Sequence, residues 1–236
     1  AVTNTKYAYY SVRANTRPVF SNCWFVGRAG LFVNASGARL TVLNSRIENI
    51  SGGNNWGPVH VESMSSGFFD NCRIAKCAAN ATYGIFDLVG ASDFTNCVFE
   101  ANTSSGILID APNSTSTRFY DCRFVGNVLT TSGSDKYFVE GREFRNCSFV
   151  SNVVRQTGTS ADGNVRLLHG TAGETPIENT TFYANEAIRD QPTLASGNVD
   201  VALIPSRNWK LSFVNCTFAE NAARATVGDG ATVRSA

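Results

Sequence analysis

The sequence predicts an all-β protein, a right-handed parallel β-helix (β-solenoid) of about eight coils with roughly three strands per coil. Three observations support this prediction: a short repeated pattern, the regular placing of its apolar residues, and the lack of any sustained helical periodicity. The pattern reads apolar-x-Asn-Cys-x-apolar, and its Asn positions are separated by 22, 27, 25, 25, 25, 33 and 36 residues. A period of this size is typical of a solenoid, in which each repeat buries its apolar face against its neighbours.

Each repeat is expected to contain two short strands joined by a bend at the Asn. The apolar anchors Phe94 and Phe99 are five residues apart, so strict strand alternation would put them on opposite faces. A bend at Asn96 lets both rings face one core, because Asn tolerates turn conformations. We expect this column to be a buried ladder of hydrogen-bonded side chains, since an amide both donates and accepts. Its members are Asn22, Asn44, Asn71, Asn96, Asp121, Asn146, Asn179 and Asn215.

Two further features recur in the later part of each repeat. A second Asn column follows three residues after the second anchor, at Asn102, Asn127, Asn152, Asn185 and Asn221. A third strand, introduced by Gly, Pro or Asn, is expected at residues 30–33, 58–62, 84–87, 106–110, 164–168 and 198–202. The repeat lengthens near residues 153–163 and 187–198, and insertions in a solenoid are expected to form loops on one side.

The whole chain, residues 1–236, is expected to be a single domain. The repeat core covers about residues 20–221 and a polar tail covers residues 222–236. Neither end resembles a cap, so we expect a segment of a larger protein. The net charge of +1 gives no indication of a nucleic-acid partner, and no apolar stretch is long enough to predict membrane insertion by this segment.

The repeats resemble a known family. Asn96-Cys-Val-Phe-Glu-Ala-Asn102, Asn146-Cys-Ser-Phe-Val-Ser-Asn152 and Asn215-Cys-Thr-Phe-Ala-Glu-Asn221 are similar to the Phe-x-x-Asn repeats of polymorphic outer-membrane proteins. More broadly, about 200 residues of the chain resemble the right-handed parallel β-helix, or pectin-lyase-like, superfamily. The resemblance implies a β-helix fold and a protein that is secreted or displayed on a cell surface, as in bacterial adhesins and in surface proteins of protists and algae.

The cysteines show the same repeat. Six of the seven share one inward-facing column, at Cys23, Cys72, Cys97, Cys122, Cys147 and Cys216. They are interpreted either as small packing residues or as disulfides between adjacent coils, since neighbouring strands lie within the Cα separation of a disulfide. With only two His and no Cys-x-x-Cys pair, neither a metal site nor a cofactor is expected.

Eight Asn-x-Ser/Thr sequons occur in the sequence. Those at Asn34, Asn80 and Asn113 lie in expected loops and would be glycosylated if the protein passes through a eukaryotic secretory pathway. The sequons at Asn146, Asn179 and Asn215 are discounted because these residues belong to the ladder that we expect to be buried.

A catalytic site has weaker support. His60 and Glu62 alternate on one expected strand and share a face, and Asp110 and Arg166 could approach that face from later coils. Such groups could perform acid/base or lyase chemistry, although a solvated polar face is the favoured interpretation of these residues. The motifs of polygalacturonase-type hydrolases and pectate lyases are absent apart from the dipeptide at His169.

The sequence therefore favours a non-catalytic role. We expect an extracellular or cell-surface structural or adhesive module, a component of a surface filament or appendage that presents loops for contacts with proteins or glycans. Its expected partners are other surface or extracellular proteins, glycans, or further copies joined end to end. Two alternatives stay open: a carbohydrate-active enzyme using His60, Glu62, Asp110 and Arg166, and a glycan-binding module using Trp24, Trp56 and Trp209.

Overall fold

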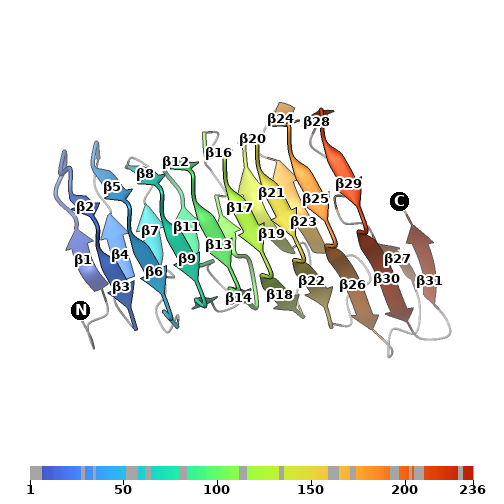
Figure 1. The fold of residues 1–236 in the computed structure, drawn as a ribbon. Coiled ribbons are helices and arrows are strands. Elements are labelled where there is room, and N and C mark those ends of the chain that lie inside the picture. Colours follow the sequence, from blue (N-terminus) through green and yellow to red (C-terminus); the bar gives the residue numbers. More distant parts are fainter. Residues whose placement is uncertain are drawn as a thin grey trace.

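The structure is a computed structural model of the 236-residue chain. It describes residues 7–27, 30–33, 36–51, 58–61, 65–79, 84–111, 116–132, 136–158, 165–170, 174–191, 197–201, 204, 210–227 and 231–235. Throughout these ranges the regular secondary structure is β-strand, and the sheets are built from parallel pairs such as β12 with β16. Strands from successive coils stack side by side along an elongated body, with β1 at one end and β31 at the other (Figure 1). The all-β parallel β-helix predicted from the sequence is thus confirmed.

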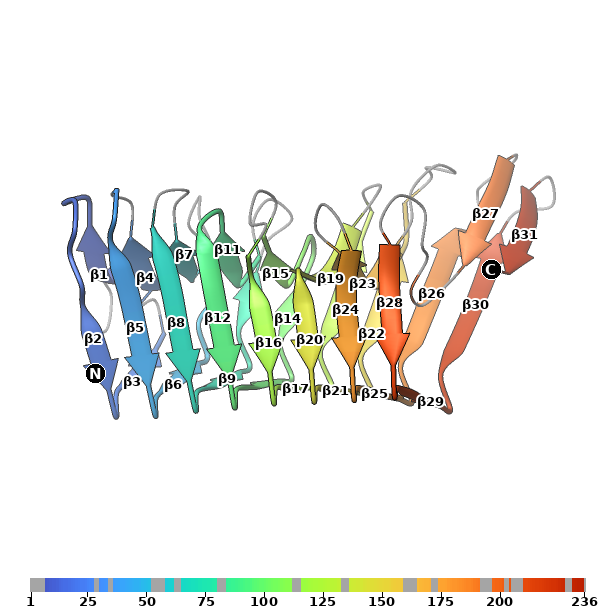
Figure 2. The same ribbon diagram turned by 90° about the horizontal axis from the view of Figure 1, so that it is seen from above.

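Sheets A and B run the length of this body as separate layers, with sheet A behind sheet B in Figure 2. Sheet A contains β1 (Tyr7–Ser11), β4 (Gly30–Val33), β7 (Val59–Val61), β11 (Phe86–Leu88), β15 (Ile109–Asp110), β19 (Lys136–Gly141) and β23 (Val165–Gly170). Sheet B contains β2 (Val19–Ser21), β5 (Arg39–Leu43), β8 (Ser66–Asp70), β12 (Ala91–Thr95), β16 (Arg118–Tyr120), β20 (Glu143–Arg145), β24 (Glu174–Glu178) and β28 (Lys210–Val214).

Sheets C and D complete the coil. Sheet C contains β3 (Trp24–Val26), β6 (Arg46–Glu48), β9 (Arg73–Ala75), β13 (Val98–Glu100), β17 (Arg123–Val125), β21 (Ser148–Val150), β25 (Thr181–Tyr183) and β29 (Thr217–Ala219). Sheet D contains β10 (Ala78–Ala79), β14 (Thr103–Ser104), β18 (Val128–Thr131), β22 (Val153–Gln156), β26 (Glu186–Gln191) and β30 (Ala222–Val227). The three strands expected per repeat correspond to sheets B, C and A, and sheet D is a fourth position that the pattern did not indicate.

The end of the chain differs from the expectation. The strand expected at residues 198–202 is β27 (Gly197–Val201), and it pairs with β31 (Ala231–Ser235) instead of extending sheet A. Residues 222–227 form β30 at the edge of sheet D, so ordered strands continue into the segment expected to be a polar tail.

Each coil turns twice through a residue in the left-handed region. The first bend is at the Asn column, where Asn96 has φ 52° and Asn146 has φ 54°. Asn is among the few residues that adopt this conformation readily. The second bend lies just before the second Asn column and is occupied by unlike residues, among them Lys76, Ala101 and Ser151.

The burial of the first Asn column was predicted wrongly. Its side chains are exposed on the outside of the bend, where Asn71 Nδ2 donates to Asn44 Oδ1 at 2.8 Å and Asn146 Nδ2 donates to Asp121 Oδ1 at 3.0 Å. The buried ladder is formed instead by the second Asn column, as Asn127 shows, because its side chains turn into the core after the second bend.

The core consists of two ladders of aromatic and aliphatic side chains. In sheet B, the rings of Phe94 and Phe119 stack with centroids 5.1 Å apart, and in sheet C those of Phe124 and Phe149 stack 4.5 Å apart. These rings are fully buried, and each stacked pair adds about 0.5–1.5 kcal/mol beyond the burial of its area. The same core continues along the body, so each coil is held chiefly by its neighbours.

Candidate functional site

A row of ionisable side chains lies on sheet A, on the face turned away from the phenylalanine core. Strand pairing aligns His60 of β7 with Asp87 of β11, Asp87 with Asp110 of β15, and Glu140 of β19 with His169 of β23. Phe86 and Leu88 flank Asp87 and belong to the core, so alternation directs Asp87 to the opposite face. We call His60, Asp87, Asp110, Glu140 and His169 the titratable row.

The first contact in this row is a buried hydrogen bond between His60 and Asp87. His60 Nδ1 lies 2.7 Å from Asp87 Oδ2, and the two side chains are 0% and 3% exposed. A carboxylate at this distance fixes the orientation of the imidazole ring.

The second part of the row is linked through one hydroxyl group. The Tyr137 hydroxyl lies 3.2 Å from Asp110 Oδ1 and 2.9 Å from Glu140 Oε2, and Glu140 Oε1 lies 3.2 Å from His169 Nδ1. The Tyr137 ring also stacks on the His169 ring with centroids 4.6 Å apart. Four side chains from three adjacent strands therefore form one continuous network.

Burial and like charge perturb two groups of this network. Burial first, and then the carboxylates of Glu140 and Asp87, raise the pKa of Asp110 to about 6. A hydrogen bond donated by Tyr137 and the charge of Lys136 act in the opposite direction on this pKa. Burial, and then the negative charges of Glu140 and Asp110, raise the pKa of Tyr137 above its ordinary value.

The sequence-based candidates are only partly brought together. His60, Asp110 and Arg166 all lie on sheet A, and Arg166 is paired in register with Tyr137. Their expected exposure was wrong: His60 is 0% exposed, and Asp110 and Arg166 are each 9% exposed. Glu62 lies outside the described residues.

Sequence reasoning missed Asp87, Tyr137 and Glu140. Asp87 and Glu140 enter the row only through the alignment of strands from different coils. The sequence singles out His169 only as part of a dipeptide. Within the described ranges, no cluster of His, Cys, Asp and Glu has the arrangement of a metal site.

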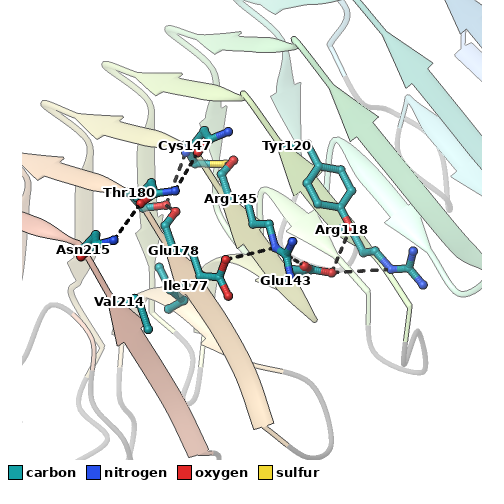
Figure 3. A network of polar contacts seen from close by, with 12 residues as sticks. Arg118, Tyr120, Glu143, Arg145, Cys147, Ile177, Glu178, Thr180, Val214 and Asn215 are labelled. Carbon is teal, nitrogen blue, oxygen red and sulfur yellow. Dashed lines mark hydrogen bonds and ion pairs between the residues drawn. The ribbon is translucent and has the colours of Figure 1, made fainter.

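A second polar surface lies on the outer face of sheet B (Figure 3). Arg145 Nε contacts Glu143 Oε1 at 2.5 Å and Glu178 Oε2 at 3.4 Å, and the Tyr120 hydroxyl donates to Glu143 Oε2 at 2.9 Å. The Arg145 side chain is 48% exposed and that of Glu178 33%, so water screens these ion pairs and each contributes little to stability.

A shallow groove of about 280 Å³ follows the bend between sheets B and C. Its lining includes Asn44, Asn71, Arg46 and Arg73. Arg73 forms ion pairs with Glu48 and Glu100, and Trp24, aligned with Arg46, is 59% exposed. Trp56 and Trp209 lie outside the described residues.

The candidate glycosylation sites fall into two groups. Asn34, Asn80 and Asn113 lie outside the described residues. The reason for discounting the sequons of the first Asn column was wrong, because Asn146, Asn179 and Asn215 are exposed.

All the cysteines are free thiols in the structure. Cys72, Cys97, Cys122 and Cys147 of the inward column are buried, whereas Cys23 and Cys216 near the two ends are partly exposed. Cys97 Sγ lies 3.3 Å from the Thr95 carbonyl and 3.5 Å from the Phe69 carbonyl, in reach of two acceptors. The structure thus matches the packing interpretation of this column.

Comparison with known proteins returned no match to the chain, whether among protein families, curated proteins or solved structures. Among the described residues, none forms an apolar helix with the length needed to cross a bilayer. The function of the chain is therefore inferred from its fold and its side-chain contacts.

Proposed function

We propose that this chain is a structural and adhesive module, secreted or displayed on a cell surface, that forms part of a filament or appendage. One observation supports the proposal: at β28 and β29, the last strands of sheets B and C among the described residues, the rings of the phenylalanine core are accessible. Phe119 and Phe124 are fully buried inside the body, whereas Phe213 and Phe218 are 41% and 51% exposed. Exposed apolar groups beside a strand edge that has no partner among the described residues favour contact with another coil.

At the opposite end, β2 and β3 are the first strands of sheets B and C. Phe20 of β2 belongs to the same core column as Phe213 and is only partly buried, whereas Phe25 of β3 is 7% exposed. A head-to-tail contact between two copies would therefore bring apolar side chains and parallel strand edges together. Repetition of one such heterologous contact produces a filament.

We further propose that the chain belongs to the pectin-lyase-like superfamily, which its sequence resembles, and that it is one of the non-catalytic surface proteins of that superfamily. The burial of His60 supports this choice over the catalytic alternative, because a fully buried imidazole cannot contact a polymeric substrate in this conformation. The exposed Trp24, beside the groove that contains Asn44 and Arg46, favours glycan binding as a second function.

Sedimentation velocity over a range of protein concentrations tests the proposal. We expect concentration-dependent oligomers that Phe218→Asp abolishes, while Val214→Lys, an equally exposed substitution on the lateral face of sheet B, retains them. A monomer at every concentration would contradict self-assembly. Turnover of a polysaccharide that is lost in His60→Ala would instead establish an enzyme, and saturable glycan binding lost in Trp24→Ala would establish the second function.

A further inference from the structure

The Tyr137 hydroxyl has one hydrogen but faces two carboxyl groups. It lies 3.2 Å from an oxygen of Asp110 and 2.9 Å from an oxygen of Glu140. If both carboxyl groups were ionised, the hydroxyl could donate to only one of them, and the other oxygen would face an oxygen lone pair. A second hydrogen is needed to satisfy both contacts.

The surroundings indicate which carboxyl group holds that hydrogen. Glu140 has a polar partner on each carboxyl oxygen, the Tyr137 hydroxyl at Oε2 and His169 Nδ1 at Oε1. For the Asp110 side chain, the Tyr137 hydroxyl is the one hydrogen-bonding partner among the described residues. Asp110 is 9% exposed and paired in register with the carboxylate of Asp87, so an ionised Asp110 would be both desolvated and repelled.

We propose that, under mildly acidic conditions, Asp110 keeps a proton and donates it to the Tyr137 oxygen, while Tyr137 donates to Glu140, so that β15 and β19 are joined by a pH-sensitive latch. The proton is released to solvent as the pH rises, and the contact between Asp110 and Tyr137 then lacks a hydrogen. The charged and titratable groups around this contact are Asp87 on β11, Lys136 and Glu140 on β19, and Arg166 and His169 on β23.

The sign of the effect follows from proton linkage. Burial, Glu140 and Asp87 raise the pKa of Asp110 to about 6 in the folded protein, compared with 3.8 for an unperturbed Asp. The folded state therefore binds more protons than the unfolded state between these two values, and its stability falls as the pH rises through them. Between pH 5 and pH 7.5, the opening equilibrium constant of this part of sheet A should increase roughly tenfold on account of Asp110.

The test measures the titration of the Asp110 carboxyl group directly, and it measures the opening of β15 and β19 by hydrogen exchange. Carbon-13 NMR of the Asp110 Cγ should show a titration midpoint near pH 6. Hydrogen exchange of the β15 and β19 amides, corrected for intrinsic base catalysis, should show the tenfold increase in opening. Asp110→Asn, whose side-chain amide donates permanently, should remove that increase. Asp121→Asn is the matched control, because it makes the same chemical change in the exposed bend, where Asn is the usual residue, and should behave like the wild type.

Two results would overturn the proposal. One is a wild-type Asp110 midpoint close to pH 4, which needs no variant and so does not depend on folding of Asp110→Asn. The other is an equal pH dependence of β15 exchange in wild type and Asp110→Asn. Both measurements use the unassembled chain, so they are independent of the filament and adhesion tests and stand or fall separately from the proposed function.

Discussion

The two Asn columns should contribute very differently to stability, although they look alike in the sequence. Asn152 is 0% exposed, and its Oδ1 accepts hydrogen bonds from the backbone N–H and the Nδ2 of Asn127. Its Nδ2 donates to the Phe124 carbonyl and to Asn185 Oδ1, both at 2.9 Å. Substitution Asn152→Ala therefore leaves several buried polar groups without this partner. At about 1–3 kcal/mol for each unsatisfied group, and allowing for partial relaxation, we expect a loss of about 4 kcal/mol.

Asn146, in the same coil, is the matched comparison. It is exposed with φ 54°, and its amide contacts Asp121 at 3.0 Å and Asn179 at 3.1 Å in the presence of water. Asn146→Gly keeps the left-handed bend accessible, so it should cost less than about 1 kcal/mol.

Equilibrium denaturation by urea, monitored by far-UV circular dichroism, measures the free energy of unfolding of Asn152→Ala and of Asn146→Gly. Hydrogen exchange at the Asn127 amide reports the local effect, which is needed because coils of a solenoid can open separately. A loss below about 1 kcal/mol in Asn152→Ala, or a larger loss in Asn146→Gly, would refute the assignment of the second column as the stabilising ladder.

Three further substitutions or treatments test other parts of the fold. Phe124→Ala should cost about 3–5 kcal/mol because the ring is fully buried between its neighbours, whereas Phe218→Ala at the exposed end should cost much less in the same denaturation assay. Cys122→Ser should change stability by less than about 1 kcal/mol, because Ser45 occupies this column naturally and its Oγ donates to the Leu43 carbonyl, while Cys122→Val should be clearly less stable. Brief alkylation of the native protein, read by peptide mass spectrometry, should modify Cys23 and Cys216 but not Cys147, because Cys147 is buried and burial raises the pKa of its thiol. Equal labelling of all the cysteines would contradict the burial of the column.

The coil architecture was predictable because its signals repeat. Two anchors five residues apart, such as Phe94 and Phe99, with a bend residue between them, recur in every repeat, so one misread repeat does not change the conclusion. The roles of the two Asn columns were not predictable in the same way. One column is selected by the left-handed bend and the other by the double hydrogen bonding of a buried amide, and both requirements select the same residue type.

The titratable row was less predictable because it depends on strand register between coils of unequal length. Asp87 and Asp110 are 23 residues apart, whereas Asp110 and Glu140 are 30 apart, so a fixed period does not align them. A slip of one residue would also turn either carboxyl group toward the core. Columns that maintain the stack must repeat, because every coil has to fit its neighbours. Tyr137 and Glu140 are aligned with the unlike residues Arg166 and His169 in the next coil of the same sheet, whereas the core residue Val139 is aligned with the core residue Leu168. In this chain, the departures from periodicity on sheet A are therefore the places where a property other than stacking should be sought.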